Sequence, residues 1–259
     1  MSAGTAVILG CGTVGTLAGR LLTARGWRVT GVRRTPSDDP GFPLLAGDAA
    51  DPTLWSRLPR PDAVLLTATP GLRGGGDNRL ADAAAAIPGD CRVVYSGTTA
   101  VYGDAGGNAV DEDGPLAETA GPLLAVETAV LAHGNALVLR CPGLVGPSRT
   151  RVQERAREAA AAGRPLTVPG DPGRPFSVLH EEDLAALLAE ALDGRLRQVR
   201  GVLNAAHPQA LTVHNYYAEQ ARRAGVSVTI ASDGSGKPSR AIDAGRLHAL
   251  LPGWVWRPA

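Results

Sequence analysis

The sequence predicts an α/β protein built on a doubly wound parallel sheet, and three observations support this. Short apolar runs alternate with longer helical runs rich in Ala, Leu and Arg, and a glycine-rich turn follows the first run. Runs that are apolar along their whole length suit strands buried on both faces of a parallel sheet. Strand–helix alternation implies right-handed crossovers. We predict strands at residues 6–10, 28–32, 63–67, 92–96 and 136–140, and helices at 14–25, 151–162, 181–192 and near 214–224.

Composition narrows the functional classes. The 259 residues include 26 basic and 25 acidic side chains, a balance that indicates neither nucleic-acid nor anionic-membrane binding. No apolar stretch approaches the roughly 20 residues that cross a bilayer, and no signal peptide is recognisable. The three cysteines are widely spaced and lack a metal-ligand pattern, which is typical of a reducing compartment. We expect a cytoplasmic protein without a metal site.

The glycine-rich turn reads Gly10-Cys11-Gly12-Thr13-Val14-Gly15, which is the pattern G-x-G-x-x-G. The first glycine makes the tight turn, the second lets the backbone approach a pyrophosphate, and the third lets the helix pack on the strand. The N–H groups and the dipole of the helix then face the anion. This context predicts a Rossmann unit that holds a nicotinamide cofactor. The alternative is an ordinary glycine-rich turn.

The end of the second strand indicates which nicotinamide cofactor is bound. An NAD site usually places Asp or Glu there, about 20 residues after the glycines, to bind the ribose 2′-hydroxyl. Here the strand ends in Arg33 and Arg34. Because guanidinium groups pair with a 2′-phosphate through two parallel hydrogen bonds, we predict NADP(H). The alternative is two solvated arginines.

Five further segments occur in order along the chain: residues 47–51 (GDAAD), 67–70 (TATP), 96–104 (SGTTAVYGD), 140–147 (RCPGLVGP) and 176–185 (FSVLHEEDLA). With this order and spacing, nearly the whole chain resembles the extended short-chain dehydrogenase/reductase superfamily, in its epimerase/dehydratase-like group. The resemblance implies the following cofactor contacts: Asp48 at the adenine, Thr67, Ala68 and Thr69 after the fourth strand, and Pro142 and Leu144 at the nicotinamide.

The chain departs from this superfamily at the catalytic motif Tyr-x-x-x-Lys, whose Tyr is the general acid/base in relatives. Counting back from Glu127, the Tyr position falls on Thr119 and the Lys position on Leu123. The absence does not depend on this alignment, because the single lysine is Lys237 and no tyrosine precedes it by four residues. The usual proton relay is therefore missing.

Three other residues are candidates for catalysis. Thr98 aligns with the superfamily's catalytic Ser/Thr, Tyr102 follows it closely, and His180 precedes a helix that approaches the active site in relatives. In the alternative interpretation, the Thr98 hydroxyl is structural, Tyr102 packs beside the cleft and His180 is structural. Arg149 and Arg174 either meet an anionic substrate or are solvated.

We predict an NADP(H)-binding domain at residues 1–146 and a smaller substrate-binding lobe at 147–259 that does not fold independently. The first hypothesis is an NADPH-dependent reductase of a small-molecule carbonyl, imine or other activated acceptor, since such acceptors need mainly a hydride and a shaped pocket. A redox-neutral epimerase, isomerase or cyclase and a noncatalytic NADP(H) sensor are the alternatives, and the substrate lobe favours an enzyme. The resemblance also implies a homodimer through residues 77–87 and 122–132, and the alternative for the second segment is a helix that faces the core.

Overall fold

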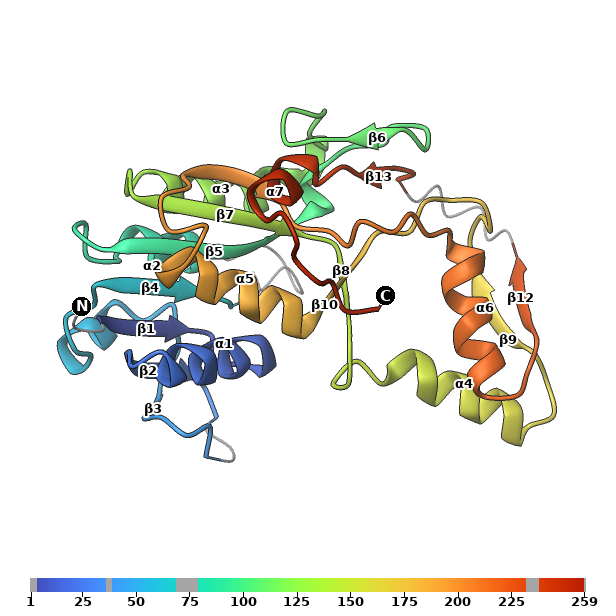
Figure 1. Ribbon diagram of the computed structural model, residues 1–259, viewed down its shortest axis with the longest axis horizontal. Helices are drawn as coiled ribbons and strands as arrows, with labels where there is room; N and C mark the ends of the chain where they lie inside the picture. The colour runs from blue at the N-terminus through green and yellow to red at the C-terminus, as the bar shows by residue number, and fades with distance from the viewer. Residues whose placement is uncertain (1–3, 36–38, 69–78, 232–237, 259) are drawn as a thin grey trace.

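A computed structural model describes residues 4–35, 39–68, 79–231 and 238–258 (Figure 1). Its centre is a seven-stranded sheet in the order β11-β7-β5-β4-β1-β2-β3, with every neighbouring pair parallel. The strands are β1 (Thr5–Leu9), β2 (Arg28–Arg33), β3 (Leu44–Ala46), β4 (Ala63–Leu66), β5 (Arg92–Thr98), β7 (Ala136–Cys141) and β11 (Gly201–Asn204). The predicted doubly wound α/β fold is therefore confirmed.

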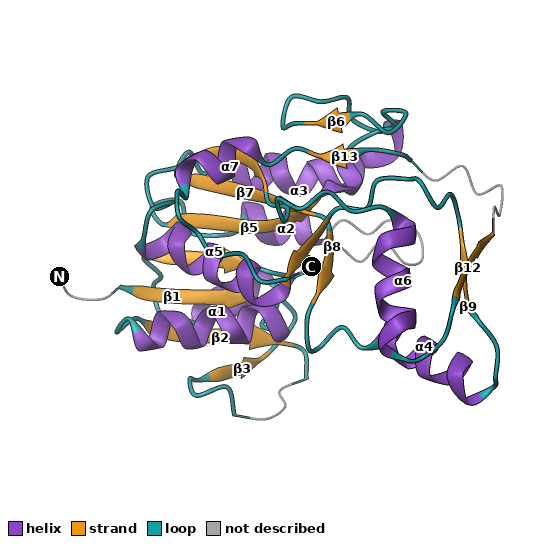
Figure 2. Cartoon of the chain, turned by 45° about the vertical axis from the view of Figure 1, so that its right-hand side comes forward, coloured by secondary structure: helices purple, strands orange, loops and turns teal. Residues whose placement is uncertain are grey.

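Helices cover both faces of the sheet (Figures 1 and 2). On β1, Ala6 and Ile8 pack in the cluster that includes α1 (Thr13–Ala24), α5 (Glu181–Asp193) and α7 (Gly245–Leu250). Val7 and Leu9 point the other way, into the cluster that includes α2 (Arg79–Ala85) and α3 (Gly121–Leu131). Because successive side chains of a strand point to opposite faces, a strand covered on both faces must be apolar throughout.

A small lobe lies beyond the carboxyl edge of the sheet (Figure 2). It contains α4 (Arg151–Ala161), β9 (Leu166–Pro169), α6 (Val213–Arg223) and β12 (Val228–Ala231), and β9 pairs with β12 in parallel. Its buried cluster is limited to Ala156, Ala159, Leu166, Val168, Val213 and Ala221. That this lobe does not fold independently stays a prediction.

The second half of the chain also returns to the main sheet. β8 (Gly143–Val145) pairs with β10 (Val178–His180), which leads directly into α5. β11 then extends the sheet beside β7, and β13 (Ala241–Ile242) pairs with β6 (Ala109–Val110). The division at residue 146 thus separates segments that share one sheet and one core.

Three short 3-10 helices complete the described structure: η1 (Pro52–Arg57), η2 (Thr99–Val101) and η3 (Glu118–Ala120). Within the described residues, no helix combines the length and the apolar character that a membrane span requires. α2 and α3 pack against one another, and the homodimer contact expected at this pair of helices stays a prediction.

Candidate functional site

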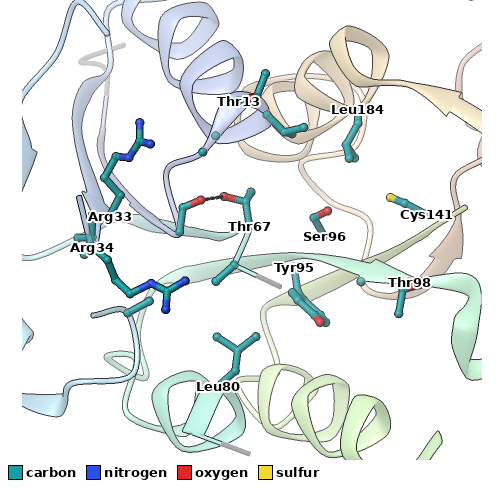
Figure 3. A pocket seen from close by; sticks show the side chains of 18 of the residues that line it. Thr13, Arg33, Arg34, Thr67, Leu80, Tyr95, Ser96, Thr98, Cys141 and Leu184 are labelled. Atoms are coloured by element: carbon teal, nitrogen blue, oxygen red, sulfur yellow. Dashed lines mark hydrogen bonds between the residues drawn. The ribbon is translucent and has the colours of Figure 1, made fainter. Parts of the chain in front are cut away.

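A cavity of about 930 Å³ opens at the carboxyl edge of the sheet (Figure 3). It lies between the loops that follow β1 and β4, where the strand order reverses, and this is where ligands bind in open parallel sheets. Arg33 and Arg34 lie at one end, Thr98 and Cys141 lie at the other, and Thr13 and Thr67 lie between them (Figure 3). We refer to these as the arginine end and the β5–β7 end.

The glycine loop forms one wall of the cavity. Gly10 has φ +82°, and a Cβ there would collide with the backbone of Ala68. A Cβ at Gly15 would lie 3.0 Å from both Ile8 Cγ2 and Thr67 Oγ1, whereas one at Gly12 would have, among the described residues, only Gly10 O nearby, at 3.9 Å. Gly12 therefore faces open space that a Cβ would partly fill.

The first turn of α1 faces the same space. No side chain caps this helix, and its first turn contains no acidic residue. A helix N-terminus without a capping side chain presents N–H donors and a partial positive charge. The glycine loop and this helix therefore fit the pyrophosphate of a dinucleotide.

The arginine end has a positive balance of charge. Arg33, Arg34 and Arg79 line it together with Asp48, the one carboxylate among the described residues of the cavity wall. Asp48 Oδ2 lies 3.2 Å from Arg79 Nη1, and Asp48 Oδ1 accepts a hydrogen bond from Ala50 N. Since its carboxylate is already paired, this end suits an anionic group.

The β5–β7 end carries neutral groups. Tyr95, Ser96, Thr98 and Cys141 line it, and Thr98 Oγ1 accepts a hydrogen bond from Ala100 N at 3.1 Å. Burial raises the pKa of Cys141 to about 12, and burial beside Glu127 raises the pKa of the Tyr95 phenol. Both groups therefore keep their protons at neutral pH.

Most of the predicted cofactor residues line this one cavity: Gly10, Gly12, Thr13, Val14, Gly15, Arg33, Arg34, Asp48, Thr67, Ala68, Pro142 and Leu144. Cys11 does not, because its side chain is buried beneath the loop against the position of Gly31. Thr69 lies outside the described residues. Of the three catalytic candidates, only Thr98 is on the cavity wall.

Tyr102 belongs to a buried polar network away from the cavity wall. Its hydroxyl donates to Asn204 Oδ1 at 2.6 Å and accepts from Arg140 Nη1 at 2.9 Å. Arg140 also forms a buried ion pair with Glu127, with 2.8 Å between Nη2 and Oε2. Burial raises the pKa of Tyr102. The phenol connects β7 to β11 through Arg140 and Asn204, and Tyr102 is absent from the described cavity wall.

His180 is the N-cap of α5 and does not line the cavity. Its Nδ1 accepts a hydrogen bond from Glu182 N at 3.2 Å. The imidazole thus occupies one of the N–H donors that the first turn of a helix leaves unpaired. This is the structural role that we set against catalysis.

Several residues of the cavity wall were not predicted as cofactor or catalytic residues. Arg79, Tyr95, Ser96, Arg149 and Leu184 line the cavity. Arg79 opens α2, at a position that no short motif marks, whereas Leu184 lies in α5 within the segment 176–185. Leu123, the residue expected at the Lys position of the catalytic motif, belongs to the buried cluster of Val101 and Tyr102. Within the described residues, no group of three or more potential metal ligands is found.

The geometry agrees with comparisons to known proteins. The model of the NAD dependent epimerase/dehydratase family matches residues 6–206. No curated protein matches the chain. A functionally unknown conserved protein from Silicibacter pomeroyi is 25% identical, with a TM-score of 0.78 over 99% of this chain and 95% of that one.

Two further solved structures have named ligands. MoeE5 in complex with UDP-glucuronic acid and NAD is 25% identical, with a TM-score of 0.75 over 98% of this chain and 94% of that one. The dTDP-glucose 4,6-dehydratase from Bacillus anthracis in complex with NAD is 16% identical and shares the fold, with a TM-score of 0.79 over 99% and 93%. The family match spans most of the chain and includes both ends of the cavity. The chain therefore belongs to the NAD dependent epimerase/dehydratase family, a group of nicotinamide-dinucleotide enzymes.

Proposed function

We propose that the protein is an NADPH-dependent reductase of a small-molecule carbonyl, imine or other activated acceptor. One observation carries the proposal. A dinucleotide-type glycine loop and the β5–β7 end line the same cavity, and the described wall of the β5–β7 end has no Tyr–Lys pair to act as acid and base. NADPH, when bound, supplies a hydride. An acceptor that already carries positive charge needs hydride delivery and orientation more than it needs a protein acid.

The protonation states at the β5–β7 end support an acceptor that needs no protein acid. The raised pKa values of Tyr95 and Cys141 make both groups weak proton donors, so neither one suits the general-acid role in carbonyl reduction. Thr98 Oγ1 accepts from Ala100 N, so its own hydrogen is left to donate to a substrate oxygen. We assign Thr98 the role of orienting the substrate.

The arginine end supports NADP(H) as the cofactor. Arg33, Arg34 and Arg79 outnumber Asp48, the one carboxylate on the described part of the cavity wall, and that carboxylate is paired. Guanidinium groups bind phosphate through two parallel hydrogen bonds, so this end suits a ribose 2′-phosphate. The preference would distinguish this protein from the relatives whose structures contain NAD.

Titration of the wild-type protein with NADPH and NADH tests the cofactor assignment. We expect tighter binding of NADPH, and we expect Arg33→Asp/Arg34→Asp to remove that preference because two carboxylates would repel the 2′-phosphate. Arg164→Asp is the matched control, since Arg164 is exposed in the loop after α4. Unchanged selectivity in the double variant would show that Arg33 and Arg34 do not read the 2′-phosphate.

The second candidate is a redox-neutral epimerase or related isomerase, favoured by the family match and by the UDP-sugar complexes of MoeE5. Stoichiometric NADPH consumption on a panel of carbonyl and imine acceptors supports the reductase. Conversion of UDP-sugars without net loss of cofactor supports the epimerase. We also propose a substrate-binding role for residues 147–259, from which Arg149 and Leu184 reach the cavity.

A further inference from the structure

The turn between β8 and α4 is built around a buried carboxylate. Glu181, the first residue of α5, has a side chain only 2% exposed. Its Oε1 accepts a hydrogen bond from Ser148 N at 2.7 Å, and its Oε2 accepts one from Ser148 Oγ. Arg149 Nε lies 3.3 Å from the same Oε2. The carboxylate therefore holds both the backbone of the turn and the guanidinium that follows it.

A glycine makes room for this arrangement. Gly146 has φ +138°, and a Cβ there would lie 2.7 Å from Glu181 Cγ and 2.9 Å from Oε1. Both the backbone conformation and the close approach of the carboxylate thus require glycine at the start of the turn. Arg149 N donates to Gly146 O at 3.0 Å, which closes the turn. The position of Arg149 is accordingly set by buried contacts.

The turn places Arg149 on the wall of the cavity that the glycine loop also lines. α5 packs along α1, and both helices begin at the carboxyl edge of the sheet (Figure 1). Arg149, tied to the first residue of α5, lines the same cavity as Gly12 and Thr13 at the start of α1. The Arg149 side chain is 43% exposed, and Glu181 is the one ion-pair partner found for it among the described residues. Its Nη groups are therefore available to an anion in the cavity.

We propose that Arg149 is a clamp for the cofactor's pyrophosphate, which it contacts from the side opposite the glycine loop. This inference rests on the proposed nicotinamide dinucleotide. The N–H groups of the loop and of α1 would bind one side of the pyrophosphate, and the guanidinium would bind the other. Glu181 and Ser148 are positioning residues that aim the guanidinium. The clamp would couple the second half of the chain to cofactor binding.

Two ligands distinguish this role from recognition of the 2′-phosphate. NADPH contains the pyrophosphate, whereas adenosine 2′-monophosphate keeps the 2′-phosphate and lacks it. We expect Arg149→Gln to weaken NADPH binding by about 10- to 100-fold, the loss typical of a hydrogen bond to a charged group. Binding of adenosine 2′-monophosphate should not change. Arg151→Gln is the matched control, because Arg151 is exposed at the start of α4 and is absent from the cavity wall.

Calorimetric titration of the full chain with both ligands gives distinct outcomes. Arg149→Lys should bind NADPH with intermediate affinity, since it keeps the charge and loses the planar fork. Equal NADPH affinity of the wild type and Arg149→Gln would overturn the clamp and leave the cofactor assignment standing. If the wild type prefers NADH to NADPH, the NADP(H) assignment fails. The clamp can then still be tested with NADH, because NADH carries the same pyrophosphate. Failure of the wild type to bind either dinucleotide would overturn both proposals.

Discussion

At the scale of single residues, the three motif glycines have different physical roles. Gly10 is required by its backbone conformation and by the proximity of Ala68, whereas Gly12 is hindered by no described residue. A side chain at Gly10 therefore strains the protein itself. A side chain at Gly12 occupies space that a ligand would use.

We accordingly expect Gly10→Ala to destabilise the protein by about 1–3 kcal/mol and Gly12→Ala to leave stability almost unchanged. NADPH affinity should fall in both variants. Urea unfolding and NADPH titration on the same preparations measure the two effects. A Gly12→Ala variant that binds NADPH like the wild type would show that the pyrophosphate does not approach this residue.

Single residues also differ in how well the sequence predicts their place in the site. The glycine motif and Arg33–Arg34 were found because their chemistry depends on local spacing, and they line one cavity. Tyr102 follows Thr98, a residue of the cavity wall, by only four positions, yet its hydroxyl belongs to a network with Arg140 and Asn204. Those partners are 38 and 102 residues away in the chain. Sequence spacing carries no information about such distant partners.

At the scale of elements, α5 is the helix that connects the two halves of the chain. It packs against α1, its first residue holds the Arg149 turn, and His180 caps its N-terminus. Substitution of His180 can test its capping role, because Asn is a strong N-cap residue and Ala is a poor one.

We expect His180→Ala to lower the free energy of unfolding by about 0.5–2 kcal/mol and His180→Asn to keep most of it. Urea unfolding curves of the two variants measure this difference. In a substrate-dependent NADPH oxidation assay, His180→Asn should retain the wild-type rate. A large loss of rate in a stable His180→Asn protein would restore the imidazole as a proton donor.

The predicted strands and helices were largely correct. Buried parallel strands are apolar throughout, and the helices that connect them are long enough to be recognised from sequence. β1, β4 and β7 lie within a residue or so of residues 6–10, 63–67 and 136–140. β11 was missed because Gly201–Asn204 is only four residues long and is not wholly apolar. Its place in the sheet comes from pairing with β7, a tertiary contact that local sequence does not encode.

At the scale of the whole molecule, the C-terminal segment packs against the core and forms an ion pair with α5. Trp254 and Trp256 pack against the cluster that contains α1 and α5. Arg257 Nη1 lies 2.6 Å from Asp183 Oδ1, and Arg257 N donates to Asp183 Oδ2 at 2.9 Å. The side chain of Asp183 is 0% exposed, and Arg257 is the ion-pair partner found for it among the described residues.

We therefore expect Arg257→Ala to destabilise the protein by about 3 kcal/mol, because it leaves a buried carboxylate without its counter-charge. Asp183→Asn should recover part of this loss in the double variant, as a double-mutant cycle would show. Arg164→Ala is the surface control, with an expected change within about 0.5 kcal/mol. If Arg257→Ala proved no more destabilising than Arg164→Ala, the C-terminal segment would not contribute to stability through this pair.

The cavity is assembled from residues as far apart in the chain as Gly10 and Leu184. None of its walls is complete until strands distant in sequence have paired, and such pairing is slow because long loops must close first. A ligand that fills the cavity therefore recognises only chains that have finished folding. By mass action it would draw the population toward that state, so that its concentration in the cell would also set how much of the newly made protein survives.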